Sequence, residues 1–304
     1  ELNYSSDIDP ILLFDPDVLA SGERSTPPET AQRMARDIVR LLSDHTEEGY
    51  VFRVDLRLRP ASEITPLAVS INAAASHYES AALPWERAAF IRARSAAGDV
   101  ARGERFLASI RPFVWRRSVD FGAIDDIAQL RVRIREAYTG ETQLGPGFDL
   151  KRGRGGIREI EFFAQTHQLI HGGRDHTLRA RGTRAALDAL AATARIRPGD
   201  ARRLGEAYDG LRTIEHRLQM IGDKQTHTLP AGEALEAVAQ LHGLEKGAQL
   251  VDLVSEHARP IAERFDALLD EDRISVPRSA PHVLSEGSAP AEVPAQLVER
   301  VTGW

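Results

Sequence analysis

Two acidic residues near the start of this chain have the types and spacing to do chemistry. Asp7 and Asp9 stand two apart in the segment Ser-Asp-Ile-Asp. If this segment is a strand, its period of two puts both carboxylates on one face and turns Ile8 to the other. Two hard oxygen ligands side by side suit Mg²⁺, which proteins hold with one or two carboxylates together with substrate phosphates. The alternative, and the commoner role of such a pair, is a turn or a solvated strand end.

A second stretch, residues 51–60, alternates more strictly than any other part of the chain. It predicts a strand with an apolar face of Phe52, Val54, Leu56 and Leu58 and a charged face of Arg53, Asp55, Arg57 and Arg59. Asp55 could complete a three-carboxylate metal cluster with Asp7 and Asp9. The arginines would offer bidentate contacts to phosphoryl oxygens and stabilise charge in a transition state. The alternative is a half-solvated strand with cross-strand ion pairs.

The elements that must position these residues are mostly helical. Apolar spacing predicts helices at 29–43, 73–97 (interrupted near Pro84), 121–137, 157–170, 183–194, 201–221, 233–241 and 249–269. A short apolar segment, Ile11–Phe14, precedes the first of them. We therefore expect a small strand-containing domain over residues 1–110, a helical bundle over 111–270 and a Pro-, Ser- and Glu-rich linker over 271–304.

Composition narrows the class of protein. The chain has 304 residues, a formal net charge of −6 and no cysteine. The absence of cysteine excludes disulfides, thiolate metal sites and cysteine nucleophiles, and fits a cytoplasmic location. No apolar run is long enough for a membrane helix. The mild acidity argues against a nucleic-acid partner, because such proteins usually carry a basic surface.

Two of the predicted helices carry polar stripes. In the helix 157–170, Arg158, Glu161, Gln165 and Gln168 share one side, and Phe162 borders it. We expect that stripe to line a wet cleft; the alternative is that it faces solvent. The helix 201–221 has the same plan, with Arg212, Glu215, His216 and Gln219 opposite an apolar row. The histidines show no zinc-ligand spacing, and no phosphate loop of the Gly-x₄-Gly-Lys-Ser/Thr type is present.

Several motifs resemble known families. An Asp-x-Asp strand with a third Asp on a later strand is similar to the nucleotidyltransferase fold of the DNA polymerase β type. A closer resemblance is to the bifunctional glutamine synthetase adenylyltransferase/adenylyl-removing enzymes. It rests on ELNYSSDID (1–9), VFRVDLRLRP (51–60), WER (85–87), IRAR (91–94), GGIREIEF (155–162) and HRLQMIGDKQTHTLP (216–230). These motifs are most like the first half of that enzyme, whose domain removes AMP.

The resemblance implies an architecture and a site. The fold class would be α+β and predominantly helical, a truncated DNA polymerase β-type nucleotidyltransferase domain followed by an all-α helical bundle. The implied catalytic and metal-binding residues are Asp7, Asp9 and Asp55. Nucleotide- and phosphate-binding residues would be Ser6, Arg53, Arg57, Arg59, Arg158 and Glu161.

The resemblance also implies a reaction. Two Mg²⁺ ions would support removal of AMP from a tyrosine of glutamine synthetase by phosphate, giving ADP, or its addition from ATP. A PII-type signalling protein is a possible regulator. Two other functions stay open: a non-catalytic docking module for glutamine synthetase or PII, and a uridylyltransferase acting on PII.

Three departures from the family pattern bear on the site. The family has a strand and a Gly-Gly turn before the equivalent of Glu1, so we expect residue 1 to fall inside the catalytic domain. Pro10 stands where a strand residue would donate a backbone hydrogen bond. The loop 61–66 has Thr65 where the family has a glycine-containing turn, and a β-branched residue adopts a positive φ with difficulty.

Overall fold

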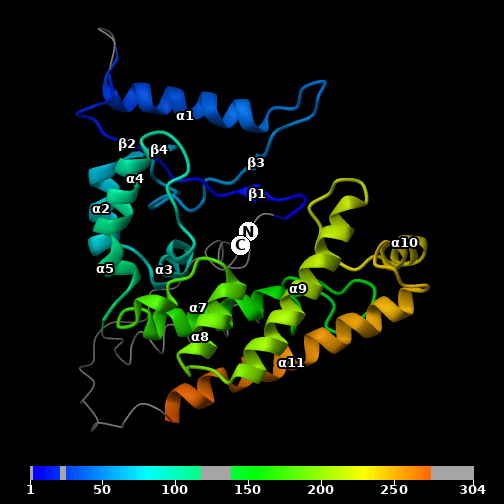
Figure 1. The fold of residues 1–304 in the computed structure, drawn as a ribbon. Coiled ribbons are helices and arrows are strands. Elements are labelled where there is room, and N and C mark those ends of the chain that lie inside the picture. Colours follow the sequence, from blue (N-terminus) through cyan, green and yellow to red (C-terminus); the bar gives the residue numbers. More distant parts are fainter. Residues whose placement is uncertain (1–2, 21–24, 118–137, 275–304) are drawn as a thin grey trace, which may run out of the picture.

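The computed structural model describes residues 3–20, 25–117 and 138–274 of the chain. Helices make up most of these residues, which confirms the predicted predominantly helical α+β class (Figure 1). The strands are β1 (Asp7–Ile8), β2 (Leu12–Phe14), β3 (Arg53–Val54) and β4 (Ala68–Ser70). The helix predicted over 121–137 and the linker beyond residue 274 lie outside the described residues.

Two parallel strand pairs position the N-terminal segment. β1 pairs with β3, with Asp7 opposite Arg53, and β2 pairs with β4, with Leu12 opposite Ala68. A parallel pair needs a crossover connection, and α1 (Pro27–Ser43) lies in that connection. In Figure 1, β1 and β3 lie between α1 and the helices of the bundle.

The start of α1 is fixed by its own sequence. The helix predicted over 29–43 is confirmed and begins two residues earlier. Pro27 and Pro28 occupy its first turn, where a backbone N–H has no helical acceptor to lose. The N–H of Thr26 donates to the Glu29 carboxylate at 2.8 Å, so the first turn closes on itself.

The strand predicted over 51–60 is wrong beyond its centre, because β3 is two residues long and a turn begins at Arg57. The Asp55 carboxylate accepts both the backbone N–H of Arg57, at 2.9 Å, and its Nε, at 2.6 Å. Arg59 donates to two carbonyls of its own turn at 2.8 and 2.6 Å. These local side-chain bonds replace the ladder. Phe52, expected on a buried face, is 37% exposed.

The backbone absorbs the two departures noted in the sequence. Pro10 lies between β1 and β2, where its missing N–H interrupts neither ladder. The positive φ expected to trouble Thr65 falls on Ala61 instead, at 45°. The Thr65 hydroxyl closes the turn by donating to the carbonyls of Pro60, at 2.6 Å, and Ala61, at 3.1 Å.

Four helices follow β4 and enclose a small core. They are α2 (Ile71–Ser80), α3 (Pro84–Ile91), α4 (Val100–Ser109) and α5 (Arg111–Val114). The break predicted near Pro84 is confirmed. α4 was not predicted from the sequence, although Asp99 caps it by accepting the N–H of Arg102 at 2.9 Å. Tyr78 is buried at the centre of this core, edge-on to Phe90.

Five predicted helices of the bundle are found close to their expected bounds. They are α7 (Ile157–His171), α8 (Thr183–Ala192), α9 (Pro198–Met220), α10 (Glu233–Leu241) and α11 (Gly247–Ile274), with a short 3-10 turn, η1 (His176–Leu178). α9 packs between α8 and α11, and α7 packs on both α8 and α9. The apolar row predicted for α9 is buried at Leu211, Ile214 and Leu218, whereas Ile221 is 39% exposed.

A glycine-rich loop fixes where α7 begins. Leu150 is fully buried, and its carbonyl accepts the N–H of Ile157 at 2.9 Å. Gly155 has a φ of 79°, and a Cβ there would lie 2.2 Å from the carbonyl oxygen of Ala258 in α11. Glycine is therefore required at this position both by the backbone conformation and by the close approach of another helix.

Replacement of Gly155 by Ala should destabilise the fold by about 3 kcal/mol or more, because left-handed strain and a clash with backbone add together. Gly243→Ala is the matched control: its φ is 81°, but nothing lies within 4 Å of the added Cβ. The control should cost only about 1 kcal/mol. Urea unfolding of both variants measures the difference, and equal losses would contradict the close packing of loop and α11.

Candidate functional site

Three carboxylates lie on or just beyond the paired strands β1 and β3: Asp7 begins β1, Asp9 follows it, and Asp55 follows β3. Beyond the paired residues, the N–H of Asp55 donates to the carbonyl of Ile8 at 2.9 Å, so Asp55 lies next to Asp9. Asp9 is exposed, but desolvation by the surrounding protein, followed by the charges of Asp55 and Asp7, raises its pKa to about 6. The sequence predicts these three residues on one face. In the structure, Asp9 interacts electrostatically with both Asp55 and Asp7.

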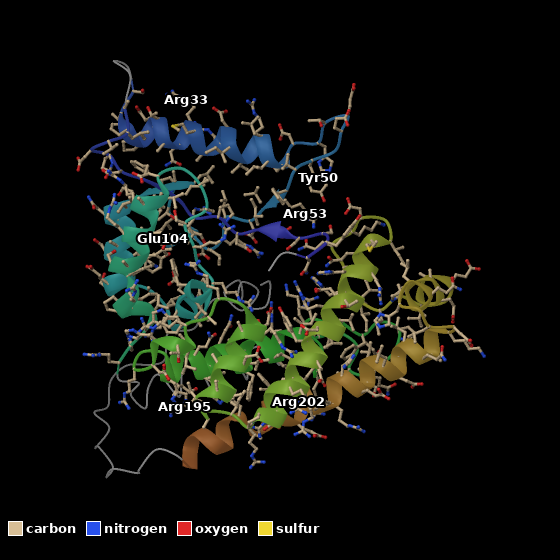
Figure 2. The ribbon with its side chains drawn as sticks, viewed as in Figure 1. Arg33, Tyr50, Arg53, Glu104, Arg195 and Arg202 are labelled. Carbon is tan, nitrogen blue, oxygen red and sulfur yellow. The ribbon has the colours of Figure 1, made fainter. Side chains whose placement is uncertain are left out.

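Arg53 neutralises the first of these carboxylates. Its Nε donates to Asp7 at 2.9 Å, and its other nitrogens donate to the Tyr50 hydroxyl at 2.6 Å and to the Ser5 hydroxyl at 2.9 Å. Figure 2 shows Tyr50 and Arg53 together beside β3. Ser6, predicted to bind nucleotide, donates its hydroxyl to the carbonyl of Asp7 at 3.1 Å. Arg53 is thus held by three partners from two segments.

Arg57 neutralises the second carboxylate through its ion pair with Asp55. Arg59, predicted to contact phosphate, instead points its guanidinium at carbonyls of the loop after β3. All three acidic groups are hard oxygen donors, which fits Mg²⁺ in kind. The arginines cover oxygens of Asp7 and Asp55, however, and within the described ranges no three His, Asp or Glu side chains are arranged to hold a metal.

The α7 side of the site is buried rather than wet. Arg158 is 5% exposed, and desolvation lowers its pKa to about 10. Burial alone would raise the pKa of Glu161, but the charges of Arg92 and Lys151 hold it below its usual value. Arg92 forms an ion pair with Glu161 at 3.0 Å. The predicted polar stripe breaks at Gln168, which is buried and donates to two carbonyls near η1 at 2.7 Å.

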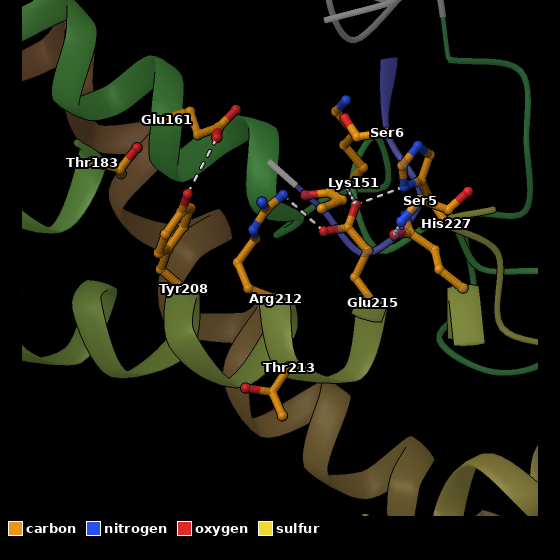
Figure 3. A network of polar contacts seen from close by, with 12 residues as sticks. Ser5, Ser6, Lys151, Glu161, Thr183, Tyr208, Arg212, Thr213, Glu215 and His227 are labelled. Atoms are coloured by element: carbon orange, nitrogen blue, oxygen red, sulfur yellow. Dashed lines mark hydrogen bonds and ion pairs between the residues drawn. The ribbon is translucent and has the colours of Figure 1, made fainter. Parts of the chain in front are cut away.

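A buried polar network joins the N-terminal segment to α9. Glu215 is fully buried; its carboxylate accepts hydrogen bonds from Arg212 at 2.8 Å and from Asn3 at 3.1 Å, and it lies 2.6 Å from Nδ1 of His227. The side-chain oxygen of Gln219 accepts the N–H of Ser5 at 2.9 Å. Figure 3 shows this network beside the N-terminal strand. The polar face predicted for α9 therefore anchors the segment that leads into the carboxylates.

One residue of the site was missed from the sequence. Lys151, in the loop before α7, interacts electrostatically with Asp9 on one side and with Arg158, Glu161, Glu215 and Arg212 on the other. A single Lys in a loop carries no periodic signal, so its place was not predictable from spacing. It puts a cation between the carboxylates and the bundle.

A separate cavity of about 330 Å³ lies between α3, α5 and the segment after η1. Its walls include Phe90, Ile91, Trp115 and Arg179, and none of the predicted site residues lines it. The candidate site is instead the region between the β1–β3 carboxylates and the cations of the loop before α7. A surface with acids on one side and cations on the other suits a phosphate-bearing ligand held with a metal ion.

Comparisons with known proteins match both parts of the chain. The family model of glutamate-ammonia ligase adenylyltransferase matches residues 1–109, and that of GlnD PII-uridylyltransferase matches residues 128–269. A bifunctional glutamine synthetase adenylyltransferase/adenylyl-removing enzyme of Rhizobium meliloti is 46% identical over 90% of this chain and 28% of its own length.

Two further relatives carry the same name. The protein of Caulobacter vibrioides is 50% identical over 80% of this chain and 25% of its own length. That of Bradyrhizobium sp. strain BTAi1 is 42% identical over the whole chain and 30% of its own length. The chain thus spans less than a third of the relatives that it matches. No helix of the described residues is long and apolar enough to cross a membrane. These relatives align across both the strand-bearing and the helical parts, which confirms the resemblance of this chain to the bifunctional glutamine synthetase adenylyltransferase/adenylyl-removing enzymes.

Proposed function

We propose that this chain carries a site for metal-dependent nucleotidyl transfer on a protein tyrosine. The observation that supports it best is the electrostatic interaction of Asp9 with both Asp55 and Asp7 beside the paired strands β1 and β3. The relatives' name points to addition and removal of adenylyl groups on glutamine synthetase. As the family resemblance implies, AMP would be removed by phosphate, giving ADP, or added from ATP. A PII-type signalling protein would be a regulator, as the family resemblance implies.

In this proposal the carboxylates of Asp7, Asp9 and Asp55 would hold Mg²⁺. A bound metal pair supplies Lewis-acid stabilisation of the attacking and leaving oxygens at phosphorus. Arg53 in β3 and Arg57 in the turn after it lie on either side of Asp55 along the chain and would supply positive charge for the non-transferring oxygens. Residues 1–110 would form a nucleotidyltransferase domain of the DNA polymerase β type, and residues 111–270 a helical bundle whose α7 and α9 close the site.

Two other functions each have an observation in their favour. Arginines already neutralise Asp7 and Asp55, which suits a docking module that binds glutamine synthetase or PII without catalysis. The match of residues 128–269 to GlnD PII-uridylyltransferase suits a uridylyltransferase. We favour the adenylyl reaction because relatives aligned over 80% of the chain or more carry that name.

Ligand-dependent melting separates catalysis from docking. The chain is heated with Mg²⁺ and ADP, ATP or UTP, and with each nucleotide alone. A specific site should stabilise the fold by about 2.7 kcal/mol at a hundredfold excess over Kd. We expect a shift with adenine nucleotides that requires Mg²⁺. A preference for UTP would favour the uridylyltransferase, and no shift with any nucleotide would favour docking.

Asp7→Asn and Asp55→Asn should each lower kcat for release of AMP from adenylylated glutamine synthetase at least about a hundredfold, because the metal's stabilisation of charge is worth several kcal/mol. Asp252→Asn, at an exposed position of α11, is the control and should leave kcat unchanged. Circular dichroism checks the fold of each variant. Rates like those of the unmodified chain for either site variant would refute the metal proposal.

Asp9→Asn should stabilise the metal-free protein at neutral pH. Because the folded state raises the pKa of Asp9 from 3.8 to about 6, ionisation of this group destabilises the fold as the pH rises through that range. In EDTA at pH 7.5 the variant should melt about 2 °C higher than the unmodified chain. The difference should shrink as the pH falls toward 4, where Asp9 is already protonated in the folded state.

With Mg²⁺ the unmodified chain should melt at a higher temperature than Asp9→Asn. The metal ion stabilises the ionised carboxylate of Asp9, and an Asn side chain cannot take the place of that carboxylate as a ligand. Melting curves at pH 7.5 with and without about 10 mM Mg²⁺, an excess chosen for a weakly binding carboxylate site, check this expectation. A variant that gains as much from Mg²⁺ as the unmodified chain would show that Asp9 is no ligand. Asp252→Asn again serves as the control.

A further inference from the structure

The backbone of Lys151 is fixed on both sides. Its N–H donates to the carboxylate of buried Asp149 at 2.9 Å, and its carbonyl accepts the N–H of Arg158 at 3.0 Å. Gly153 and Gly156, which follow it, have no room for a Cβ against neighbouring carbonyls. The glycine-rich loop therefore presents this side chain from a defined point at the start of α7.

The ammonium of Lys151 lies among charged groups that are bound elsewhere. Glu215 is bound to Arg212, Asn3 and His227, and Glu161 forms its ion pair with Arg92. Among the described residues, the Lys151 ammonium has no hydrogen bond or ion pair, whereas its backbone N–H donates to Asp149. Figure 3 shows the side chain among Ser6, Arg212 and Glu215.

This surrounding is costly for a cation. Desolvation, followed by the charge of Arg158, lowers the pKa of Lys151. A half-buried cation without a bonded anion destabilises a fold unless a ligand completes it. The cation also lies within electrostatic reach of Asp9, so an anion bound next to it would stand beside the carboxylate cluster.

We propose that Lys151 is a phosphate-binding residue of this site, whose ammonium contacts phosphoryl oxygens held between the loop before α7 and the carboxylates of β1 and β3. The inference rests on the proposed function and adds to it a residue on the bundle side. The same chemistry is presented by inorganic phosphate and by the phosphates of ADP. Both are therefore tested, together with Mg²⁺.

The chain offers a direct probe, because it contains three lysines: Lys151, Lys224 and Lys246. Reductive methylation with ¹³C-formaldehyde gives each a separate methyl signal and keeps its charge. Lys224 and Lys246 are exposed and serve as internal controls. We expect saturable shifts of the Lys151 signal with Mg²⁺ and ADP, and with Mg²⁺ and inorganic phosphate, while the two control signals stay in place. This measurement does not depend on whether a substituted variant folds, because it uses the unsubstituted chain.

Lys151→Met should weaken binding of ADP and of phosphate at least about tenfold in calorimetric titration, since a charged hydrogen bond is lost. Lys246→Met, which removes an exposed ammonium, should bind as the unmodified chain does. The melting temperature of each variant reports whether it folds.

The outcomes separate the two proposals. Nucleotide binding with an unmoved Lys151 signal, or with unchanged affinity in Lys151→Met, would overturn the role of Lys151 and leave the proposed function standing. If the unmodified chain binds neither ADP nor phosphate with Mg²⁺, the proposed function itself fails for this chain. A shift of the Lys151 methyl signal with inorganic phosphate but not with ADP identifies phosphate as the bound group. A shift with ADP but not with phosphate identifies the nucleotide. Either result supports a phosphate-binding Lys151.

Discussion

Like charge concentrated at two strand ends is the constraint to which the rest of this site responds. Parallel pairing of β1 and β3 leaves Asp9 beside Asp55, and Asp7 lies two residues before Asp9, opposite Arg53. Arg53 is paired with Asp7 and Arg57 with Asp55, whereas desolvation, followed by the charges of Asp55 and Asp7, raises the pKa of Asp9 to about 6. The segment 53–57, which contributes Asp55, thus also contributes the two arginines that neutralise Asp7 and Asp55.

The bundle holds the acidic segment in place as well as facing it. Glu215 and Gln219 are fully buried, and both bind residues that immediately precede β1. Removing one partner from such a buried set leaves a desolvated charge or polar group, which costs far more than a surface contact. β1 is only two residues long, so its own ladder contributes little. Its position therefore depends on α9, more than 200 residues away along the chain.

Periodicity predicted the helices, because their spacing follows from local geometry. The predictions from periodicity were wrong where a side chain forms a hydrogen bond with a backbone group. Asp55 captures the N–H of Arg57, and this local bond ends the strand that alternation extended to residue 60. Gln168 sits in the predicted wet stripe but satisfies buried carbonyls near η1. Lys151 could not be predicted, since its place depends on glycines that close against another helix.

Arg53 in β3 and Arg57 in the turn after it differ in how firmly their guanidinium groups are held, which matters if a phosphate takes the place of a carboxylate. Arg53 is bound by Tyr50 and Ser5 as well as by Asp7, so its guanidinium would keep its place if the carboxylate turned to another cation. Arg57 has a side chain that is 48% exposed and can reorient with little loss of packing. If a ligand carried a metal cation to the carboxylates, Arg53 would already be oriented, and Arg57 could turn from Asp55 toward the phosphate of that ligand. Because positive charge is exchanged rather than removed, such a rearrangement need not leave any acid uncompensated.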